Sequence, residues 1–315
     1  MGLLVDGVWH DDWYDTSATG GRFVRKEAQF RHVIGEGGEF SPQAGRYHLY
    51  VSLACPWAHR TLIFRKLKGL EALIDVSVVH PHMLEHGWSF QFGAEPLYGF
   101  DHAHQLYTKS EANYSGRVTV PILWDKESSR IVNNESSDII RIFNSAFDDL
   151  TGNDLDFYPE PLRVQIDALN ELVYANINNG VYRCGFATTQ EAYDEAYDNL
   201  FAVLDELETC LDKQRYLVGE VVTEADWRLF TTLIRFDAVY FSHFKCNQRR
   251  IYDYPNLFAY MCDLYQTEGV AETVDLWHIK QHYYYSHESI NPTRIVPKGP
   301  AQDWHIEHNR ARRFA

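Results

Sequence analysis

The sequence is short of positive charge. Its 315 residues include 29 Lys and Arg against 44 Asp and Glu, which gives a formal net charge of −15. Proteins bind nucleic acid by neutralising phosphates with Lys and Arg, so this composition argues against a nucleic-acid-binding function. The same deficit argues against docking on an anionic membrane surface. It does not exclude a small anionic ligand, which needs only a local site.

Long hydrophobic runs are missing as well. No stretch approaches the ~18 apolar residues of a transmembrane helix, so the sequence predicts no membrane span. The segment from Met1 to Asp12 lacks a basic start followed by an apolar core, so no secretory signal is expected. Asp6 stands where N-myristoylation requires Ser or Thr, so no lipid anchor is expected either.

Cysteine is scarce, and its number is odd. The chain has five cysteines, which argues against a disulfide framework and predicts a reducing compartment, the cytoplasm. No metal site is expected. His278 and His282 are four residues apart on a predicted helix, but Ile279 stands where a zinc protease would have Glu. The bland interpretation, histidines on a helix surface, is preferred.

Aromatic residues are plentiful, at 15% of the chain, with 20 Tyr, 18 Phe and 8 Trp. Most should lie in cores, because aromatic side chains bury large areas. Tyrosine is amphipathic, however, and an excess of it can also line a wet pocket for a flat ligand. Composition alone does not separate these two interpretations.

The chain length predicts about two domains, and the patterning divides them near residue 150. Residues 1–45 mix glycines with aromatics and predict a long ordered arm. The segment 46–150 predicts a small α/β domain, because strand, helix and strand follow one another as in a right-handed parallel crossover. The expected strands cover 47–52, 74–79, 118–125 and 130–133, and the expected helices cover 57–68 and 139–147.

Residues 151–315 predict a second, all-helical domain that ends in a proline-rich tail. Apolar residues recur every three or four positions, the period of an amphipathic helix. Thr188 with Glu191, and Thr223 with Asp226, resemble capping boxes that begin two of the helices. The expected fold class is therefore α/β plus all-α.

Cys55 is the residue whose position points to chemistry. It follows a predicted strand and precedes Pro56, which suits the first turn of a helix. The macrodipole and the unpaired N–H groups of a helix N-terminus stabilise a thiolate by up to ~2 kcal/mol, which lowers the pKa of the thiol. We therefore predict a nucleophilic thiol rather than an inert buried one.

Ala58 then limits what this thiol does. A dithiol redox motif needs its second cysteine three residues after the first, and Ala58 occupies that position. A mixed disulfide on Cys55 must be resolved by another thiol, and glutathione is the abundant one in cells. A resolving role for Cys184 stays open as a minor alternative, whereas Cys210 falls on an amphipathic helix and should be core.

These features resemble the glutathione transferases, and most closely the glutathionyl-hydroquinone reductases, the Xi class. The segments that carry the resemblance are CPWAHR at 55–60, SGRVTVP at 115–121, NES at 134–136, NGVY at 179–182, residues 217–227, HFKC at 243–246 and INPT at 290–293. The resemblance implies a thioredoxin-like domain with Pro121 as a cis-proline, followed by a helical domain. It also implies a homodimer.

The resemblance further implies which residues hold glutathione as co-substrate. Glu135 would take the ammonium and Ser136 the carboxylate of the γ-glutamyl end, and a helix N-terminus suits a carboxylate. Val118 would pair its backbone with the cysteinyl unit. Arg117 would offer its charge to a carboxylate, and Trp88 would cover the peptide. The alternative roles are a solvated side chain for Arg117 and a loop anchor for Trp88.

The same resemblance assigns two tyrosines to the aromatic substrate. Tyr182 and Tyr283 would hydrogen-bond the oxygens of the quinol, while Cys55 attacks the glutathione sulfur. Core packing is the alternative for either tyrosine, and Tyr284 and Tyr285 are easily confused with Tyr283. Two other functions remain: an omega-like thioltransferase or dehydroascorbate reductase, which shares Cys55 without needing the tyrosines, and a non-catalytic transferase-like binding module.

Overall fold

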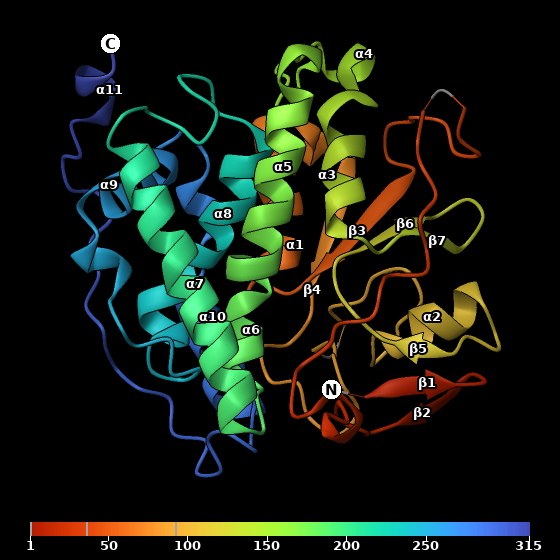
Figure 1. Ribbon diagram of the computed structural model, residues 1–315. Coiled ribbons are helices and arrows are strands. Elements are labelled where there is room, and N and C mark those ends of the chain that lie inside the picture. The colour runs from red at the N-terminus through yellow and green to blue at the C-terminus, as the bar shows by residue number, and fades with distance from the viewer. Residues whose placement is uncertain (1, 36, 92) are drawn as a thin grey trace. The chain divides into compact units, whose positions relative to one another are not determined.

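The computed structural model describes residues 2–35, 37–91 and 93–315 (Figure 1). Contacts between residues divide the chain into two compact units. Unit 1 comprises Met1–Trp13, Glu27–Leu155 and Thr273–Glu288, and unit 2 comprises Tyr14–Lys26, Asp156–Glu272 and Ser289–Ala315. No helix within the described ranges is long and apolar enough to cross a membrane.

A four-stranded sheet is the main strand layer of unit 1. Its strands stand in the order β4-β3-β6-β7, with β3 and β4 parallel and the other neighbours antiparallel. Parallel neighbours need a crossover connection, and α1 supplies it, as the order of predicted elements indicated. The bounds are β3 Tyr47–Val51, α1 Pro56–Leu67, β4 Ile74–Val78, β6 Ile122–Asp125 and β7 Arg130–Asn133.

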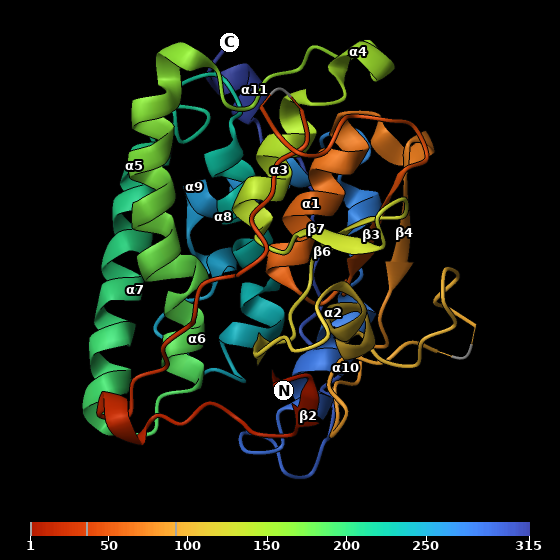
Figure 2. The same ribbon diagram turned by 90° about the vertical axis from the view of Figure 1, so that its right-hand side faces the viewer.

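Helices α1 and α3 (Ser136–Ser145) lie side by side in unit 1 (Figures 1 and 2). Pro56 is the first residue of α1, where its missing N–H needs no partner. The helix ends before Gly69, whose φ of 68° lies in the left-handed region that favours glycine. Helix α3 begins earlier than predicted, because Glu135 already caps it by accepting the N–H of Ser137.

The N-terminal arm contains strands that the sequence did not predict. β1 (Leu3–Val5) pairs with β2 (Val8–His10) and also with β5 (Gly116–Arg117), so three short strands form a second sheet in unit 1. Strands of two or three residues are too short to show a period in the sequence. This sheet braces the chain directly before Val118.

A loop-rich insertion between β4 and β5 carries one short helix, α2 (His104–Ser110). The Glu95 carboxylate anchors the loop. It accepts the hydroxyl proton of Tyr50 at 2.8 Å and the backbone N–H groups of Leu97, Tyr98 and Phe100 at 3.0, 2.8 and 3.1 Å. Burial alone would raise the pKa of Glu95, but these four hydrogen bonds outweigh it, so the pKa of the carboxyl is lowered.

Helix α10 (Leu276–Ser286) comes late in the sequence but belongs to unit 1. Asp275 caps it by accepting the N–H of His278. Nothing in the spacing of its apolar residues distinguishes α10 from the helices of unit 2, so this return of the chain could not be predicted. It brings Tyr283 into the same unit as Cys55.

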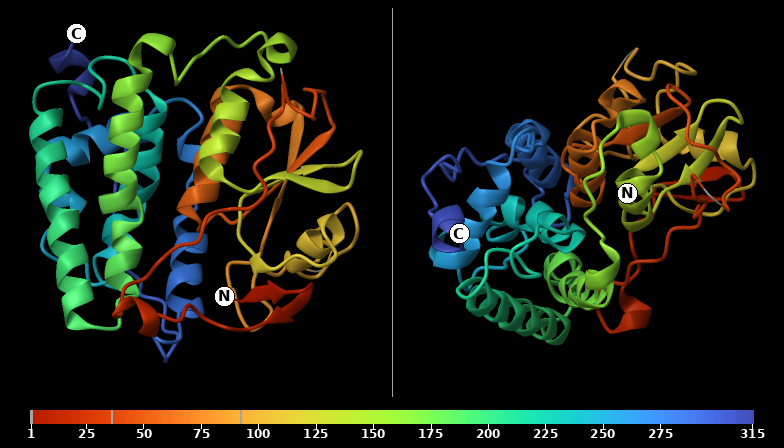
Figure 3. Two further views of the ribbon diagram at one scale, coloured as in Figure 1. Left: turned by 45° about the vertical axis from the view of Figure 1, so that its right-hand side comes forward. Right: turned by 90° about the horizontal axis from the view of Figure 1, so that it is seen from above.

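Unit 2 is built from helices (Figure 3). The long helix α7 packs against α6 and α9, and α8 packs against α5 and α9. Thr223 and Asp226 form the predicted capping box at the start of α8. For α7 the prediction was one residue early, because Thr189 rather than Thr188 accepts the N–H of Ala192. The bounds are α5 Arg163–Val173, α6 Gly180–Gly185, α7 Gln190–Leu211, α8 Glu224–Arg235 and α9 Pro255–Tyr265.

Two helices of unit 2 continue into π-helical turns. α5 passes into Tyr174–Asn178 (η4) and α8 into Phe236–Tyr240 (η5), where the sequence predicted uninterrupted α-helix. Such turns are frequent near functional sites, and η4 leads into α6, which carries Tyr182. The remaining short elements are η1 Ser17–Thr19, η2 Leu70–Ala72, α4 Asp148–Thr151, η3 Glu160–Leu162, η6 Ile251–Asp253, η7 Ala271–Thr273 and α11 Arg310–Arg313.

Candidate active site

Cys55 is the N-cap residue of α1. Its backbone is extended, with φ −73° and ψ 119°, so the chain enters the helix directly after it. The thiol donates to the carbonyl oxygen of Val120, with Sγ 3.4 Å from that oxygen. The Val120–Pro121 peptide bond is cis, as the resemblance implied. The predicted nucleophile therefore stands at a helix N-terminus and beside the cis-proline segment.

The helix that begins at Cys55 offers no second thiol. Ala58 is fully buried one turn along α1. None of the five cysteines, all of which lie in the described part of the chain, forms a disulfide. Cys184, the minor candidate for a resolving role, is buried in α6 of unit 2. A mixed disulfide on Cys55 is therefore not resolved from within its own helix.

Glu135 and Ser136 stand at the N-terminus of α3. The Glu135 Oε1 accepts from Ser137 twice, from its N–H at 3.1 Å and from its hydroxyl at 3.0 Å. Ser136 is only 2% exposed, and its hydroxyl accepts from the Arg60 guanidinium at 3.4 Å. A helix N-terminus attracts anions through its unpaired N–H groups and its dipole. A carboxylate would suit this place, and the binding of one by Ser136 stays a prediction, while the Glu135 carboxylate serves the helix cap.

Arg117 and Val118 follow the arm sheet. The Arg117 guanidinium donates to the carbonyl oxygens of Asp12 and Trp13, the latter at 3.0 Å. The N-terminal arm thus already uses the side chain that was predicted to bind a carboxylate of glutathione. Val118 is buried and lies between β5 and the cis-proline, so its backbone is held at both ends.

Trp88 is buried in unit 1 and stacks on a histidine of α10. The rings of Trp88 and His282 have centroids 4.8 Å apart and planes inclined by 25°. The His282 Nδ1 lies 2.9 Å from the carbonyl oxygen of Pro81, so this nitrogen carries the proton and donates. Helix α10 therefore packs against one face of the Trp88 ring and fixes its position.

The three consecutive tyrosines of α10 differ in their surroundings. Tyr283 is 1% exposed and Tyr284 is 7% exposed. The ring of Tyr283 lies near those of His282 and His287, at centroid distances of 5.2 and 5.5 Å. Tyr285 instead stacks on His82 at 3.8 Å, with planes nearly parallel. Tyr283 is thus surrounded by imidazoles of its own unit.

Tyr182 lies in α6 of unit 2 and is 8% exposed. Aromatic rings surround it, among them Phe244 at 5.5 Å and Phe186 at 6.1 Å. The Arg25 guanidinium lies over its ring, 5.1 Å from the centroid. The predicted substrate tyrosines therefore belong to different units, Tyr182 to unit 2 and Tyr283 to unit 1.

Two histidine contacts near Cys55 were missed in the sequence. His278 Nε2 lies 3.4 Å from the hydroxyl of Ser52, three residues before Cys55. His59 Nε2, one turn into α1, lies 2.7 Å from the hydroxyl of Thr273. The four-residue spacing of His278 and His282 was a signal, but the preferred interpretation, histidines on a helix surface, was wrong, because both side chains are buried. Within the described ranges, no group of three or more His, Cys, Asp or Glu side chains could hold a metal ion.

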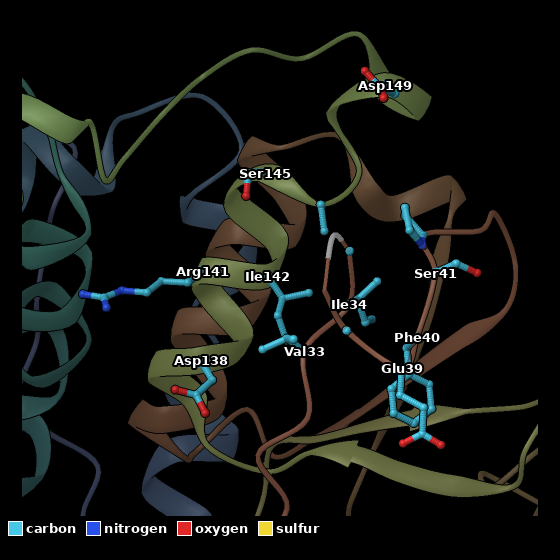
Figure 4. A pocket seen from close by; sticks show the side chains of 14 residues that line it. Val33, Ile34, Glu39, Phe40, Ser41, Asp138, Arg141, Ile142, Ser145 and Asp149 are labelled. Atoms are coloured by element: carbon cyan, nitrogen blue, oxygen red, sulfur yellow. The ribbon is translucent and has the colours of Figure 1, made fainter.

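A cavity of about 920 Å³ opens elsewhere in unit 1, between α3 and the loop that follows residue 32. In Figure 4 the Ile142 side chain of α3 faces Val33 of that loop. None of the predicted site residues lines this cavity. Its size alone therefore does not identify it as the candidate active site.

The thioredoxin-like sheet, the helix N-terminus at Cys55 and the helical unit together define a glutathione S-transferase. The family model described as "Glutathione S-transferase, N-terminal domain" matches residues 54–146, and "Glutathione S-transferase, C-terminal domain" matches residues 190–261. Glutathionyl-hydroquinone reductase YqjG of Escherichia coli is 54% identical over the whole of both chains. Glutathionyl-hydroquinone reductase PcpF of Sphingobium chlorophenolicum is 58% identical over 96% of this chain and 97% of that protein. The chain belongs to the glutathionyl-hydroquinone reductase family.

Solved structures agree with this assignment. A glutathione-bound structure of YqjG from Escherichia coli superposes with a TM-score of 0.91 at 50% identity, covering 99% of this chain and 100% of that one. An Xi class transferase from Natrialba magadii gives a TM-score of 0.91 at 46% identity, covering 99% and 97%. The predicted fold class, a thioredoxin-like domain followed by a helical one, is confirmed, and so is the predicted resemblance.

Proposed function

We propose that this chain is a glutathione-dependent oxidoreductase that removes glutathione from glutathionyl-hydroquinones and releases the hydroquinones. Relatives more than 50% identical over nearly their whole length carry this activity in their names. One observation carries the chemistry: the Cys55 thiol stands at the N-terminus of α1 beside the Val120 carbonyl, with Ala58 where a dithiol enzyme has its second cysteine. Such a thiol forms a mixed disulfide and leaves its resolution to glutathione.

The reaction proceeds in two displacements. Hydroxyl groups of Tyr182 and Tyr283 hydrogen-bond the substrate oxygens and favour a keto tautomer, in which the ring carbon attached to sulfur also carries a proton. The Cys55 thiolate then attacks the glutathione sulfur. The carbon–sulfur bond breaks, its electron pair returns to the ring, and the oxygen takes up a proton to give hydroquinone. A second glutathione thiolate attacks the mixed disulfide, which releases glutathione disulfide and the Cys55 thiolate.

Glutathione is held by unit 1 in this proposal. Ser136 and the N-terminus of α3 bind the γ-glutamyl carboxylate, and Glu135 binds the ammonium. The backbone of Val118 pairs with the cysteinyl unit, Arg117 attracts a carboxylate, and Trp88 covers the peptide. The helix N-termini at Cys55 and Ser136 support this arrangement, because both favour a negative charge.

The omega-like thioltransferase activity is the second candidate, and it would share Cys55. We prefer the reductase, because the two bacterial relatives, which are 54% and 58% identical to this chain, bear that name. A purely binding module is not favoured, because it would need neither Cys55 nor its position at the start of a helix. Comparing turnover of menadiol-type glutathione conjugates with that of a small mixed disulfide separates the two enzyme activities.

We further propose that the protein acts as a homodimer in the cytoplasm, where glutathione is reduced and abundant. The family resemblance supports the dimer, and five cysteines without a disulfide support the reducing compartment. Light scattering of the purified chain measures the oligomeric state, and a single-chain mass would overturn the dimer.

Intact-mass spectrometry tests the mechanism. After mixing with a glutathionyl-hydroquinone and no free glutathione, the protein should gain one glutathione on Cys55. Adding glutathione should then restore the original mass and give ping-pong kinetics. Full turnover by Cys55→Ser would overturn the mechanism.

A further inference from the structure

The hydroxyl of Tyr107 joins two segments that the proposed glutathione site needs. Tyr107 lies in α2, within the insertion between β4 and β5, and it is fully buried. It donates its proton to the carbonyl oxygen of Thr119 at 2.8 Å. It accepts the N–H of Thr119 at 3.1 Å and the side-chain amide of Asn134 at 3.1 Å. One donor and two acceptor sites are all that a phenol hydroxyl has, so its capacity is used in full.

The first of these contacts orients Val118. Both backbone groups of Thr119 reach the same oxygen atom, so they point to the same side of the chain. In an extended chain the backbone groups of neighbouring residues point to opposite sides, as they do in a β-ladder. On a chain that continues the extended course of β5 through Val118 and Thr119, the N–H and the carbonyl of Val118 face away from Tyr107. That is the orientation in which a peptide ligand can pair with them.

The second contact fixes the start of α3. Asn134 directly precedes Glu135 and Ser136, and it is buried. Its amide nitrogen donates to Tyr107, its amide oxygen accepts the N–H of Phe30 at 3.2 Å, and its own N–H donates to the Phe30 carbonyl at 3.1 Å. Asn134, directly before the N-terminal end of α3, is thus hydrogen-bonded both to Tyr107 and to Phe30.

The Tyr107 ring itself is packed. Its centroid lies 5.9 Å from that of Phe30 and 5.0 Å from that of Tyr114. Desolvation raises the pKa of Tyr107, so the hydroxyl keeps the proton that it donates. The oxygen is therefore a fixed point with a constant hydrogen-bonding pattern.

We infer that Tyr107 is a positioning residue for glutathione: its buried hydroxyl sets the spacing between the Val118 backbone and the N-terminus of α3. The inference rests on the proposed function, which places glutathione on these two segments. Tyr107 itself touches neither the ligand nor the reacting sulfur in this arrangement. It acts by holding the two ends of the peptide site at a constant separation.

The test compares Tyr107→Phe with Tyr47→Phe. The second variant is a matched control. Tyr47 is also fully buried, and its hydroxyl also donates to a backbone carbonyl, that of Ser41 at 2.7 Å. Tyr47 begins β3, at the end away from Cys55. Both variants should lower Tm. Only Tyr107→Phe should weaken glutathione binding, by about tenfold for the loss of buried hydrogen bonds, with kcat at saturating glutathione changed much less than KM.

Asn134→Ala is the second variant, and it keeps the test decisive if Tyr107→Phe does not fold. It removes the bond from Asn134 to Tyr107 together with the side-chain bond to the Phe30 N–H, and it should raise the Kd for glutathione by about threefold. A double mutant of Tyr107 and Asn134 should then weaken binding by less than the product of the two single effects. An unchanged Kd in Tyr107→Phe, or in Asn134→Ala where Tyr107→Phe cannot be purified, overturns the inference.

Ser136→Ala distinguishes this failure from failure of the proposed function. If Ser136→Ala weakens glutathione binding and Tyr107→Phe does not, the site stands and the positioning role is wrong. If Ser136→Ala and Tyr107→Phe both leave binding unchanged, glutathione does not occupy the start of α3, and the proposed site falls together with the positioning role.

Discussion

The indole of Trp88 rests on the imidazole of His282, with ring centroids 4.8 Å apart and 25° between the planes. The two residues are far apart in the sequence, yet both belong to unit 1. The contact joins a proposed glutathione-binding residue to the helix that carries Tyr283. If Trp88 covers glutathione as proposed, α10 also helps to hold the peptide, in addition to its proposed contact with the aromatic ring.

His282→Ala should therefore raise the KM for glutathione. An aromatic pair contributes about 1 kcal/mol beyond its buried area, which corresponds to about fivefold in affinity. His282→Phe keeps a ring beneath Trp88 while removing the bond to Pro81, so it should keep most of the affinity. Steady-state kinetics with varied glutathione measures both variants.

His86→Ala is the control for this prediction. His86 lies in the same insertion, and its side chain is 61% exposed. Its removal should leave the KM for glutathione unchanged. Equal effects of His86→Ala and His282→Ala would show that loop disturbance, rather than the stack under Trp88, controls affinity.

The cysteines should differ sharply in reactivity. Cys184, Cys246 and Cys262 are buried, whereas Cys55 is half-buried at a helix start. Cys210 is also half-buried rather than core as predicted, but desolvation raises the pKa of its thiol. Burial raises the pKa of Cys262 to about 12 and also raises the pKa of Cys246, so neither is a thiolate at neutral pH. A limiting amount of iodoacetamide at pH 7 should label Cys55 first.

Peptide mass spectrometry checks this labelling. The Cys55→Ser variant should take up alkylating reagent only slowly, until urea exposes the remaining thiols. Rapid labelling of any other cysteine in the folded wild-type chain would contradict the proposed assignment of Cys55 as the activated thiol.

Lys68 should be important for the stability of unit 1. Its side chain is fully buried after the end of α1 and pairs with Asp148, Nζ to Oδ1, at 2.9 Å. The ammonium also donates to the carbonyl oxygens of Asn153, at 2.9 Å, and of Leu155. Lys68→Met leaves these acceptors without their donor and should lower the free energy of unfolding by about 3 kcal/mol.

Lys66→Met is the matched control, because Lys66 lies on the same helix and pairs with Glu71 at 3.1 Å in a partly exposed position. Surface pairs contribute less than about 1 kcal/mol, so its effect should be small. Urea unfolding measures both variants, and equal losses would contradict the importance of burial.

His48 should contribute to acid sensitivity. Desolvation lowers its pKa from 6.5 to about 4, and its ring Nε2 lies 2.9 Å from the Ser77 hydroxyl. Between these two pH values the unfolded chain binds a proton that the folded chain does not. Stability therefore falls as the pH drops from 6.5 towards 4, by up to about 3 kcal/mol from this residue.

His48→Gln provides the measurement. Glutamine keeps a hydrogen-bonding group for Ser77 but does not titrate, so the variant should lose less stability than the wild type between pH 7 and pH 4.5. The change in stability with pH must be compared between the wild type and His48→Gln, because His104 and His243 also have a pKa lowered to about 4 and contribute equally to both. Identical pH dependence would mean that His48 does not titrate as described.

The local signals in the sequence were sufficient for the central elements of unit 1. Pro56 and Gly69 bracket α1 because each has a backbone preference that acts on its own, and the N-cap position of Cys55 follows from them. The family resemblance then led to the correct fold class. The roles of the individual glutathione and quinol contacts remain predictions.

Contacts between distant segments could not be read from local signals. β1 pairs with β5, which follows more than a hundred residues later, and neither strand is long enough to show a period that would predict the pairing. The roles of the Tyr107 hydroxyl and the His282 ring depend on contacts with residues that are distant in the sequence, such as Asn134 and Trp88. Tyr107 carried no signal in the sequence, and His282 was noted only for its spacing from His278.

The position of α10 in the sequence also has a consequence for synthesis. The ribosome releases Cys55 and α1 early, but His278, His282 and Tyr283 emerge only after the whole of the helical segment Asp156–Glu272. A nascent chain therefore carries the thiol long before the residues that pack behind Trp88 and Ser52. These contacts are among the last parts of the protein to form, and an incompletely translated chain would present the cysteine without them.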